Sequence, residues 1–241
     1  MRKLVIAALV TAVSAGSAFA QQVIRMGTEG AYEPYNFIND KGEIDGFERE
    51  LGDKLCEIAG YTCEWVKNDW DTIIPNLLSG NYDTIMAGMS ITDERKEKID
   101  FTQNYFPPAA SAYVALAGAD DSVINGNIAA QVNTIQSAYI AESDATLIEF
   151  AIADETVAAV RNGEADAVFA DKDYLQKIVD ESNGELKFVG EDVQLGGGVG
   201  MGVRKSDTEM RDKFDAAITQ LKGDGTLNAM IEKWFNIKDA F

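Results

Sequence analysis

Two side chains that suit a carboxylate follow the end of one apolar strand. Residues 84–86 lead into the small residues Ala87 and Gly88, whose backbone N–H groups can donate to an anion. Ser90 then offers a hydroxyl, and Arg95 follows in a turn typical of a helix start. A guanidinium grips a carboxylate with two parallel hydrogen bonds. These residues predict a site for the α-carboxylate of a free amino acid.

The arginine also has a simpler interpretation. Residues 94–98 are all charged, and such a run is more often a solvated helix face than a binding site. The motifs that accompany Arg95 elsewhere in the chain decide between the two interpretations.

The strand before Ser90 belongs to a series in which strands alternate with helices. Apolar periodicity predicts strands at 23–27, 63–66 and 83–87 and helices at 46–56 and 70–78. This alternation implies an α/β fold with a mainly parallel sheet flanked by helices, which binds ligands at the carboxyl ends of its strands. Ser90 and Arg95 lie just past such an end.

A second unit repeats this pattern. Pro107 and Pro108 suggest that the chain crosses in extended form into strands at 127–132 and 167–170 and helices at 136–142 and 155–162. The chain then returns through 196–203, where glycine alternates with apolar residues, as in a strand that another backbone or helix approaches closely. Helices at 208–221 and 225–235 follow. Because the return strand has no G-x-G-x-x-G pattern, it gives no support to a dinucleotide site.

Charge and composition exclude several classes of function. The chain of 241 residues has a net charge of −19 and contains no histidine. Such an acidic surface repels nucleic acid and favours the approach of cations. Without histidine, a zinc site or a Ser-His-Asp hydrolase is disfavoured. We expect no nucleic-acid partner, no metal and no cofactor.

The first twenty residues have the features of a secretory signal peptide. Arg2 and Lys3 precede the apolar run 4–13, and small residues stand before the expected cleavage after Ala20. Cleavage would remove two basic residues and no acidic one, so the net charge would fall from −19 to −21. No later segment approaches the ~18 to 20 apolar residues of a membrane helix. We therefore expect a soluble protein in a Gram-negative periplasm, without a lipid anchor because the residue directly after Ala20 is not a cysteine.

The two cysteines, Cys56 and Cys63, predict a disulfide in an exported chain. Its short loop should contribute about 2 to 3 kcal/mol to stability. Two thiols alone cannot complete a tetrahedral metal site.

Five short segments, in order along the chain, carry a family resemblance. They are residues 27–37, 68–71, 87–95, 133–136 and 169–171. Together with the cysteine pair and the C-terminal helix, they resemble the polar amino-acid family of substrate-binding proteins of ATP-driven (ABC) importers. The resemblance covers essentially the whole chain after residue 20.

The resemblance implies the two-lobed type II periplasmic binding protein fold. In this fold two α/β lobes are joined by two crossover strands and close on the ligand by a hinge motion. The first lobe would consist of residues 22–110 and 196–241, and the second of residues 111–195.

The resemblance also implies how the backbone groups of an amino acid are held. Arg95 would bind the α-carboxylate with help from Ser90, the backbone around Gly88, and Thr134. Asp171 and the Gly88 carbonyl would take the α-ammonium. Both charges of a zwitterion must be matched when water is expelled, since leaving one unpaired is costly.

The ligand side chain would lie between Tyr32 and Trp70, although aromatic residues are more often plain core residues. Glu29 stands where relatives that bind basic ligands hold the distal cation, and Glu48 occupies another position that is acidic in such relatives. An acidic ligand is disfavoured because its second carboxylate would face Glu29, Glu48 and Asp171.

Some positions depart from the family pattern. Ala87 and Gly88 stand where many relatives carry hydroxyls, Asn133 replaces a glycine, and Ile135 replaces a residue that is often threonine. Gln131 and Gln136 could bond a distal amide or guanidinium, or could equally be solvated. The expected ligand-binding residues are Glu29, Tyr32, Glu48, Trp70, Ala87, Gly88, Met89, Ser90, Arg95, Gln131, Thr134, Ile135, Gln136 and Asp171.

We therefore expect a periplasmic, monomeric, non-enzymatic receptor for a cationic L-amino acid, namely arginine, lysine or ornithine, which it delivers to an inner-membrane permease. Within the same class, the alternatives are glutamine, a broad range of polar amino acids, or an opine, since 28–30 and 36–37 resemble the opine branch. More remote are a periplasmic dehydratase on the same fold and the extracellular domain of a sensor.

Overall fold

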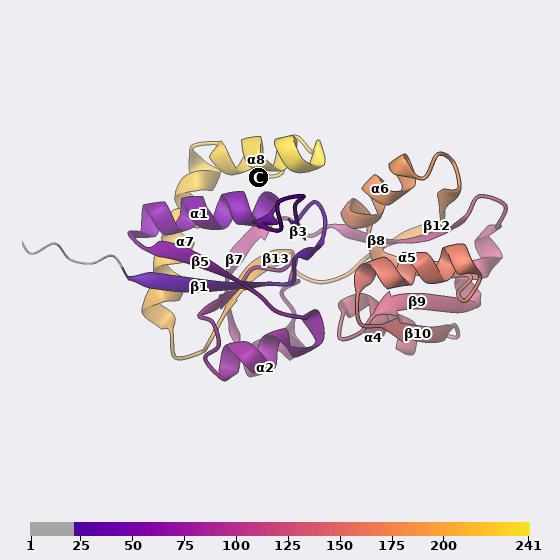
Figure 1. Cartoon of the computed structure of the whole chain (residues 1–241), viewed down its shortest axis with the longest axis horizontal. Coiled ribbons are helices and arrows are strands. Elements are labelled where there is room, and N and C mark those ends of the chain that lie inside the picture. The colour runs from indigo at the N-terminus through magenta and orange to yellow at the C-terminus, as the bar shows by residue number, and fades with distance from the viewer. Residues whose placement is uncertain (1–21) are drawn as a thin grey trace, which may run out of the picture.

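The computed structural model describes residues 22–241, which form two lobes that lie side by side (Figure 1). The expected signal peptide, residues 1–20, lies outside the described residues. Among residues 22–241, no helix combines the length and the apolar character needed to cross a bilayer.

The first sheet has five strands, and its polypeptide comes from both ends of the described chain. The strand order is β5 (Thr62–Lys67), β1 (Val23–Thr28), β6 (Thr84–Ile85), β13 (Val199–Val203) and β7 (Asp100–Phe106). One face of this sheet is covered by α1 (Phe47–Ala59), α7 (Thr208–Gly223) and α8 (Thr226–Phe235), and the other by α2 (Ile73–Leu78) (Figure 1). Helix α1 buries Phe47, Leu51 and Leu55, whose four-residue spacing places them on one face.

The second sheet repeats this plan. Its strand order is β10 (Thr146–Phe150), β9 (Asn127–Gln131), β11 (Ala167–Asp171), β8 (Ala110–Leu116) and β12 (Leu186–Gln194). Its helices are α4 (Ile135–Ala141), α5 (Ala153–Asn162) and α6 (Lys172–Glu181), and the short helix η2 (Asp121–Asn125) follows β8.

Both sheets are mixed, although a mainly parallel arrangement was expected. Strand β1 is parallel to β5 and β6, and β9 is parallel to β10 and β11. In contrast, β13 is antiparallel to β6 and β7, and β8 is antiparallel to β11 and β12. In each sheet one strand, β13 or β8, therefore runs against the other four, and each of these two is the first strand after a crossover. The expected α/β fold class is confirmed.

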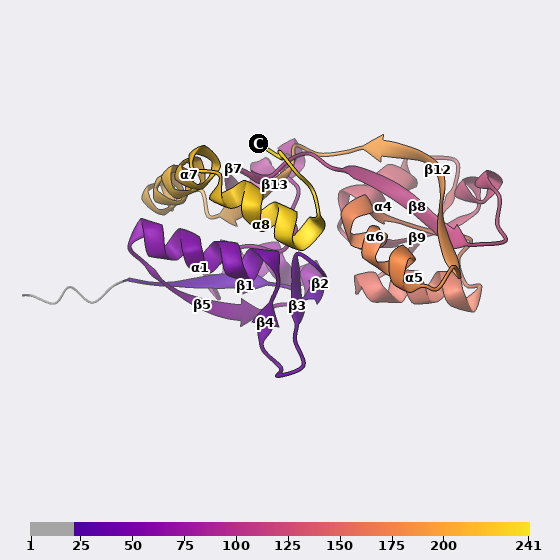
Figure 2. The same ribbon diagram turned by 90° about the horizontal axis from the view of Figure 1, so that it is seen from above.

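Two extended segments join the sheets. Strand β7 leads into β8 through residues 107–109, and β12 leads into β13 through residues 195–198 (Figure 2). We call the part that carries the first sheet the first lobe and the part that carries the second sheet the second lobe. The lobe boundaries expected from the sequence stay a prediction.

The glycine-rich return strand is β13, and close packing accounts for its glycines. A Cβ atom on Gly200 would lie 2.7 Å from the Cδ1 atom of Ile91, and one on Gly202 would lie 3.0 Å from that of Ile99. Side chains from the first lobe therefore occupy the space that larger residues would need.

Two smaller features complete the first lobe. Strands β2 (Ala31–Tyr32), β3 (Asn36–Ile38) and β4 (Ile44–Asp45) form a short antiparallel sheet. Cys56 of α1 and Cys63 of β5 form a disulfide with a Cα–Cα distance of 6.0 Å, so the predicted disulfide is confirmed.

Candidate ligand-binding site

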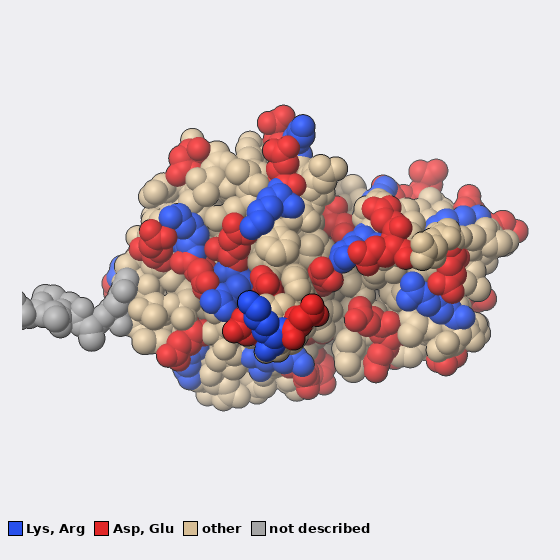
Figure 3. Space-filling view, turned by 45° about the horizontal axis from the view of Figure 1, so that its top comes forward, with Lys and Arg blue, Asp and Glu red and all other residues tan. Residues whose placement is uncertain are grey.

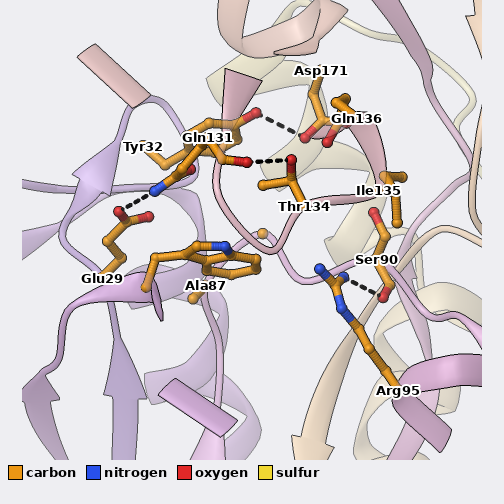
Figure 4. Close-up of a pocket in the computed structure, with 12 residues that line it drawn as sticks. Glu29, Tyr32, Ala87, Ser90, Arg95, Gln131, Thr134, Ile135, Gln136 and Asp171 are labelled. Atoms are coloured by element: carbon orange, nitrogen blue, oxygen red, sulfur yellow. Dashed lines mark hydrogen bonds between the residues drawn. The ribbon is translucent and has the colours of Figure 1, made fainter. Parts of the chain in front are cut away.

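A small cavity lies between the lobes, at the ends of strands from both sheets (Figure 4). It contains about 310 Å³ of unfilled space, a volume that includes space open to solvent. Seven lining residues come from the first lobe and five from the second: Glu29, Tyr32, Trp70, Ala87, Gly88, Ser90 and Arg95, and Gln131, Thr134, Ile135, Gln136 and Asp171.

Arg95 supplies the positive charge of the cavity. It lies in α3 (Asp93–Lys98), whose first turn is capped by Thr92, since the Thr92 hydroxyl accepts a hydrogen bond from the Arg95 N–H at 3.1 Å. The guanidinium is buried and donates to the carbonyl oxygens of Ser90 at 2.8 Å and of Asn133 at 3.0 Å. Burial lowers the pKa of Arg95 to about 10, so the side chain stays protonated at neutral pH. The solvated-face interpretation is therefore wrong for Arg95.

Asp171 faces the cavity from the end of β11. It accepts hydrogen bonds from the Tyr32 hydroxyl and from Nε2 of Gln136, both at 2.8 Å (Figure 4). Burial raises the pKa of Asp171, while these two bonds and the charge of Arg95 act against the rise. The carboxylate thus stands ready for a partner with a full positive charge.

Glu29 is a second buried carboxylate, 4% exposed, in the loop after β1. It accepts a hydrogen bond from Nε2 of Gln131 at 2.7 Å. Burial raises the pKa of Glu29 to about 7, the nearby Asp154 and Asp69 add to the rise, and the Gln131 hydrogen bond and Lys67 oppose it. Among residues 22–241, no lysine or arginine forms an ion pair with Glu29.

Two aromatic residues of the first lobe, Tyr32 and Trp70, line the cavity and also reach the second lobe. The Trp70 indole N–H donates to the Val132 carbonyl at 2.9 Å. The Arg95 guanidinium carbon lies 5.4 Å from the centre of the Trp70 ring, within cation–π range. The Trp70–Val132 bond, like the Tyr32–Asp171 and Glu29–Gln131 bonds, crosses from the first lobe to the second, so the lobes are in direct contact around the cavity.

The second-lobe turn before α4 is fixed by Thr134. Its hydroxyl donates to the Gln131 carbonyl at 2.7 Å and accepts from the Ser137 N–H at 3.0 Å, which caps the helix. Asn133 has a φ of 59°, a left-handed conformation that asparagine tolerates better than most residues. This explains how asparagine can stand where the family pattern has glycine.

Gln131 and Gln136 are buried, 7% and 4% exposed, so the alternative that they are solvated is wrong. Gln131 donates to Glu29 and to the Ala151 carbonyl, and Gln136 donates to Asp171 and to the Ser111 hydroxyl. Each glutamine therefore holds one carboxylate of the cavity in place.

Two expected site residues do not line the cavity. Glu48 is fully buried behind it and accepts hydrogen bonds from the Gly88 N–H at 2.8 Å, from Nδ2 of Asn36 at 2.7 Å and from the Tyr105 hydroxyl. It lies in the first turn of α1, next to Phe47, and both residues are buried. Met89 is fully buried in an apolar cluster of the first lobe.

Sequence reasoning missed two contributors of backbone oxygens, Val132 and Asn133, and two side chains near the cavity, Asp154 and Tyr174. A carbonyl group is present at every residue, so no residue type marks it. Tyr174 follows Asp171 by one helical turn, and only that spacing could have indicated it.

The model for bacterial extracellular solute-binding proteins, family 3, matches residues 24–237. The chain belongs to this family. The solute-binding proteins that it resembles include the lysine/arginine/ornithine-binding periplasmic protein of Escherichia coli (strain K12), which is 30% identical over 97% of this chain and 96% of the relative. The L-arginine-binding protein of Pseudomonas aeruginosa is 30% identical over 90% of this chain and 89% of the relative.

A solved structure in the same fold is closer in sequence. It is a periplasmic His/Glu/Gln/Arg/opine family-binding protein from Silicibacter pomeroyi in complex with lysine, which is 74% identical with a TM-score of 0.87 and covers 90% of this chain and 99% of that chain. The expected family and the two-lobed fold of type II periplasmic binding proteins are confirmed.

Proposed function

We propose that this solute-binding protein takes up a cationic L-amino acid, namely lysine, arginine or ornithine, in the periplasm and delivers it to an inner-membrane ABC permease. The observation that carries the proposal is Glu29, a buried carboxylate that lines the cavity and has no cationic partner among residues 22–241. A buried carboxylate is stabilised by a positive charge, which the distal group of these ligands supplies.

The backbone of the ligand would be held by Arg95 and Asp171. A guanidinium has five N–H groups, and two carbonyl oxygens accept from that of Arg95, so donors remain for an α-carboxylate. A carboxylate has about four acceptor sites, and two donors occupy those of Asp171, so an α-ammonium can be added. The Gly88 N–H is already bonded to Glu48, so we assign only the Gly88 carbonyl, and not its N–H, to the ligand.

The charge of the cavity favours a cation over an anion. Glu29 and Asp171 outnumber Arg95, so a zwitterion with one extra positive charge balances the site, and a second carboxylate would repel it. The same imbalance favours binding over the dehydratase alternative, since a dicarboxylate substrate needs a second cation in the cavity.

The molecular surface agrees with a small cationic ligand. Acidic side chains are spread over both lobes, with basic ones between them, on the face in Figure 3. With a net charge of −19, such a surface steers cations toward the cleft and disfavours nucleic acid. We propose that the protein acts as a monomer after removal of residues 1–20.

Closure by a hinge motion follows from the placement of the ligand groups. Arg95 and Glu29 belong to the first lobe and Asp171 to the second, and extended crossovers join the lobes. A ligand that contacts both lobes binds the closed state more tightly than the open one, and so shifts the population toward it.

A thermal-shift screen tests the ligand class. Ligand-free protein would be screened against the twenty amino acids, ornithine, citrulline and an opine, with Glu29→Gln and the exposed control Glu43→Gln in parallel. We expect the largest rise in Tm for lysine, arginine or ornithine, a smaller rise in Glu29→Gln, and no change from wild type in Glu43→Gln.

Other results would contradict the assignment. If glutamine or small neutral amino acids raised Tm as much as lysine or arginine, and Glu29→Gln responded in the same way, Glu29 would not bind the distal cation of the ligand. Stabilisation by the opine alone would favour the opine branch, and no response to any zwitterion would favour the enzyme alternative.

A further inference from the structure

Tyr174 of the second lobe does not line the cavity, but its ring contacts that of Tyr32, a residue of the first lobe that does. It lies in the first turn of α6 and is 2% exposed. Its ring stacks on that of Tyr32, with centroids 4.2 Å apart and planes inclined by 11°. Tyr32 lines the cavity, whereas Tyr174 does not. Because the two rings belong to different lobes, the stack exists only when the lobes are closed.

The hydroxyl groups of both rings are held by carboxylates of the second lobe. The Tyr174 hydroxyl donates to Asp154 at 2.8 Å, and the Tyr32 hydroxyl donates to Asp171 at 2.8 Å. Asp154 lies in the first turn of α5 and Asp171 at the end of β11, so two separate elements set the positions of the two hydroxyls. Tyr174 is therefore held within the second lobe before Tyr32 arrives.

We propose that Tyr174, oriented by Asp154, is a positioning residue that receives Tyr32 on closure and sets the lifetime of the closed, ligand-bound state. This inference rests on the proposed function, in which the cavity that Tyr32 lines binds an amino acid. Loss of the Tyr174 ring removes no contact to the ligand, and it frees one face of Tyr32. Such a change acts after the ligand has entered, so it affects the dissociation rate rather than the association rate.

Stopped-flow kinetics with L-lysine and L-arginine would test the proposal on the full mature chain. Tyr174→Leu removes the stack, and Tyr174→Phe keeps the stack while removing the bond to Asp154. The control Tyr139→Leu changes an exposed tyrosine of the same lobe, whose ring contacts Phe169 of that lobe.

We expect dissociation of the ligand from Tyr174→Leu to be about 2- to 10-fold faster than from wild type, with an unchanged association rate. Tyr174→Phe should lie closer to wild type, and Tyr139→Leu should leave both rates unchanged. A purely structural role would lower Tm without this split between the rates. An unchanged dissociation rate in Tyr174→Leu, or an equal rise in Tyr139→Leu, would overturn the proposal.

A second measurement needs no ligand. Dyes on Ala229→Cys and Glu164→Cys, exposed positions in the two lobes, would report the closed fraction of the free protein by energy transfer. We expect Tyr174→Leu to lower this fraction. If Tyr174→Leu does not fold, Tyr32→Leu removes the same stack from the other lobe, and an unchanged closed fraction there would overturn the proposal.

The two measurements separate the two hypotheses. A lower closed fraction without binding of any amino acid would support the role of Tyr174 in closure and contradict the proposed function. Binding of lysine with neither measurement altered in Tyr174→Leu would keep the proposed function and reject the role of Tyr174.

Discussion

Gln131 of the second lobe donates through its Nε2 atom to the Glu29 carboxylate of the first lobe, at 2.7 Å. The bond joins the end of β9 to the loop after β1, and both side chains are buried. The bond from the neutral Gln131 lowers the pKa of Glu29, but burial outweighs it and raises this pKa to about 7. The protonation of Glu29 is thus set to change near neutral pH.

The affinity for lysine or arginine should therefore depend on pH. The cation binds the ionised form of Glu29, so its arrival lowers the pKa of Glu29 and releases a proton. Above pH 8 the carboxyl is already ionised and affinity is constant, whereas below pH 7 the ligand must displace a proton. We expect affinity to fall by about 10- to 30-fold between pH 8 and pH 5.5, by titration calorimetry.

The control for this prediction is Glu29→Gln, which cannot titrate. Its affinity should be lower than that of wild type at pH 8 and should change less between pH 8 and pH 5.5. Burial also raises the pKa of Asp171, so some pH dependence should persist in Glu29→Gln. Identical pH profiles for the two proteins would show that Glu29 does not meet the ligand cation.

Arg95→Ala tests the assignment of the α-carboxylate. Loss of a buried, hydrogen-bonded charge partner typically costs 2 to 5 kcal/mol, so calorimetry should show affinity for lysine at least about 30-fold lower. The exposed neighbour Lys96→Ala on the same helix should bind as wild type does.

Lysine methyl ester separates recognition from a general loss of structure in Arg95→Ala. The ester lacks the carboxylate charge, so wild type should bind it much more weakly than lysine. In Arg95→Ala the difference between the two ligands should largely disappear. If the difference persists in Arg95→Ala, another group recognises the carboxylate.

The sequence predicted the parts of the site that lie at strand ends. Arg95, Asp171 and Glu29 each follow an apolar strand, and the periodicity of such strands is a local signal. The cavity contains Arg95, which the strand-end pattern indicated, and Glu29 and Asp171, which the family resemblance indicated, but not Glu48. The sheets proved mixed because the direction of a returning strand depends on the crossovers, which periodicity does not reveal.

Contacts between the lobes were not predictable from local pattern. The burial of Gln131 and Gln136 depends on residues of distant segments that cover them, and the stack of Tyr32 on Tyr174 joins separate lobes. Backbone acceptors such as Val132 carry no signature of residue type. Glu48 was expected in the site because its position is acidic in relatives, yet its side chain points into the core of the first lobe.

This placement of Glu48 predicts an effect on stability rather than on ligand choice. Its carboxylate accepts hydrogen bonds from Gly88, Asn36 and Tyr105. Burial raises the pKa of Glu48, whereas these three hydrogen bonds lower it. In Glu48→Gln, the new amide N–H₂ group would replace an oxygen that accepts from one of these three donors. Two donors would then face each other, and leaving a buried donor unsatisfied costs about 1 to 3 kcal/mol. Urea unfolding should show a loss of this size in the free energy of unfolding.

The matched control is Glu57→Gln, an exposed position at the other end of α1, which should unfold as wild type does. In Glu48→Gln the ratio of the affinities for lysine and glutamine should stay constant, because Glu48 reaches the ligand only through the backbone at Gly88. A changed ratio would mean that Glu48 interacts with the distal cation of the ligand and is a residue of the binding site.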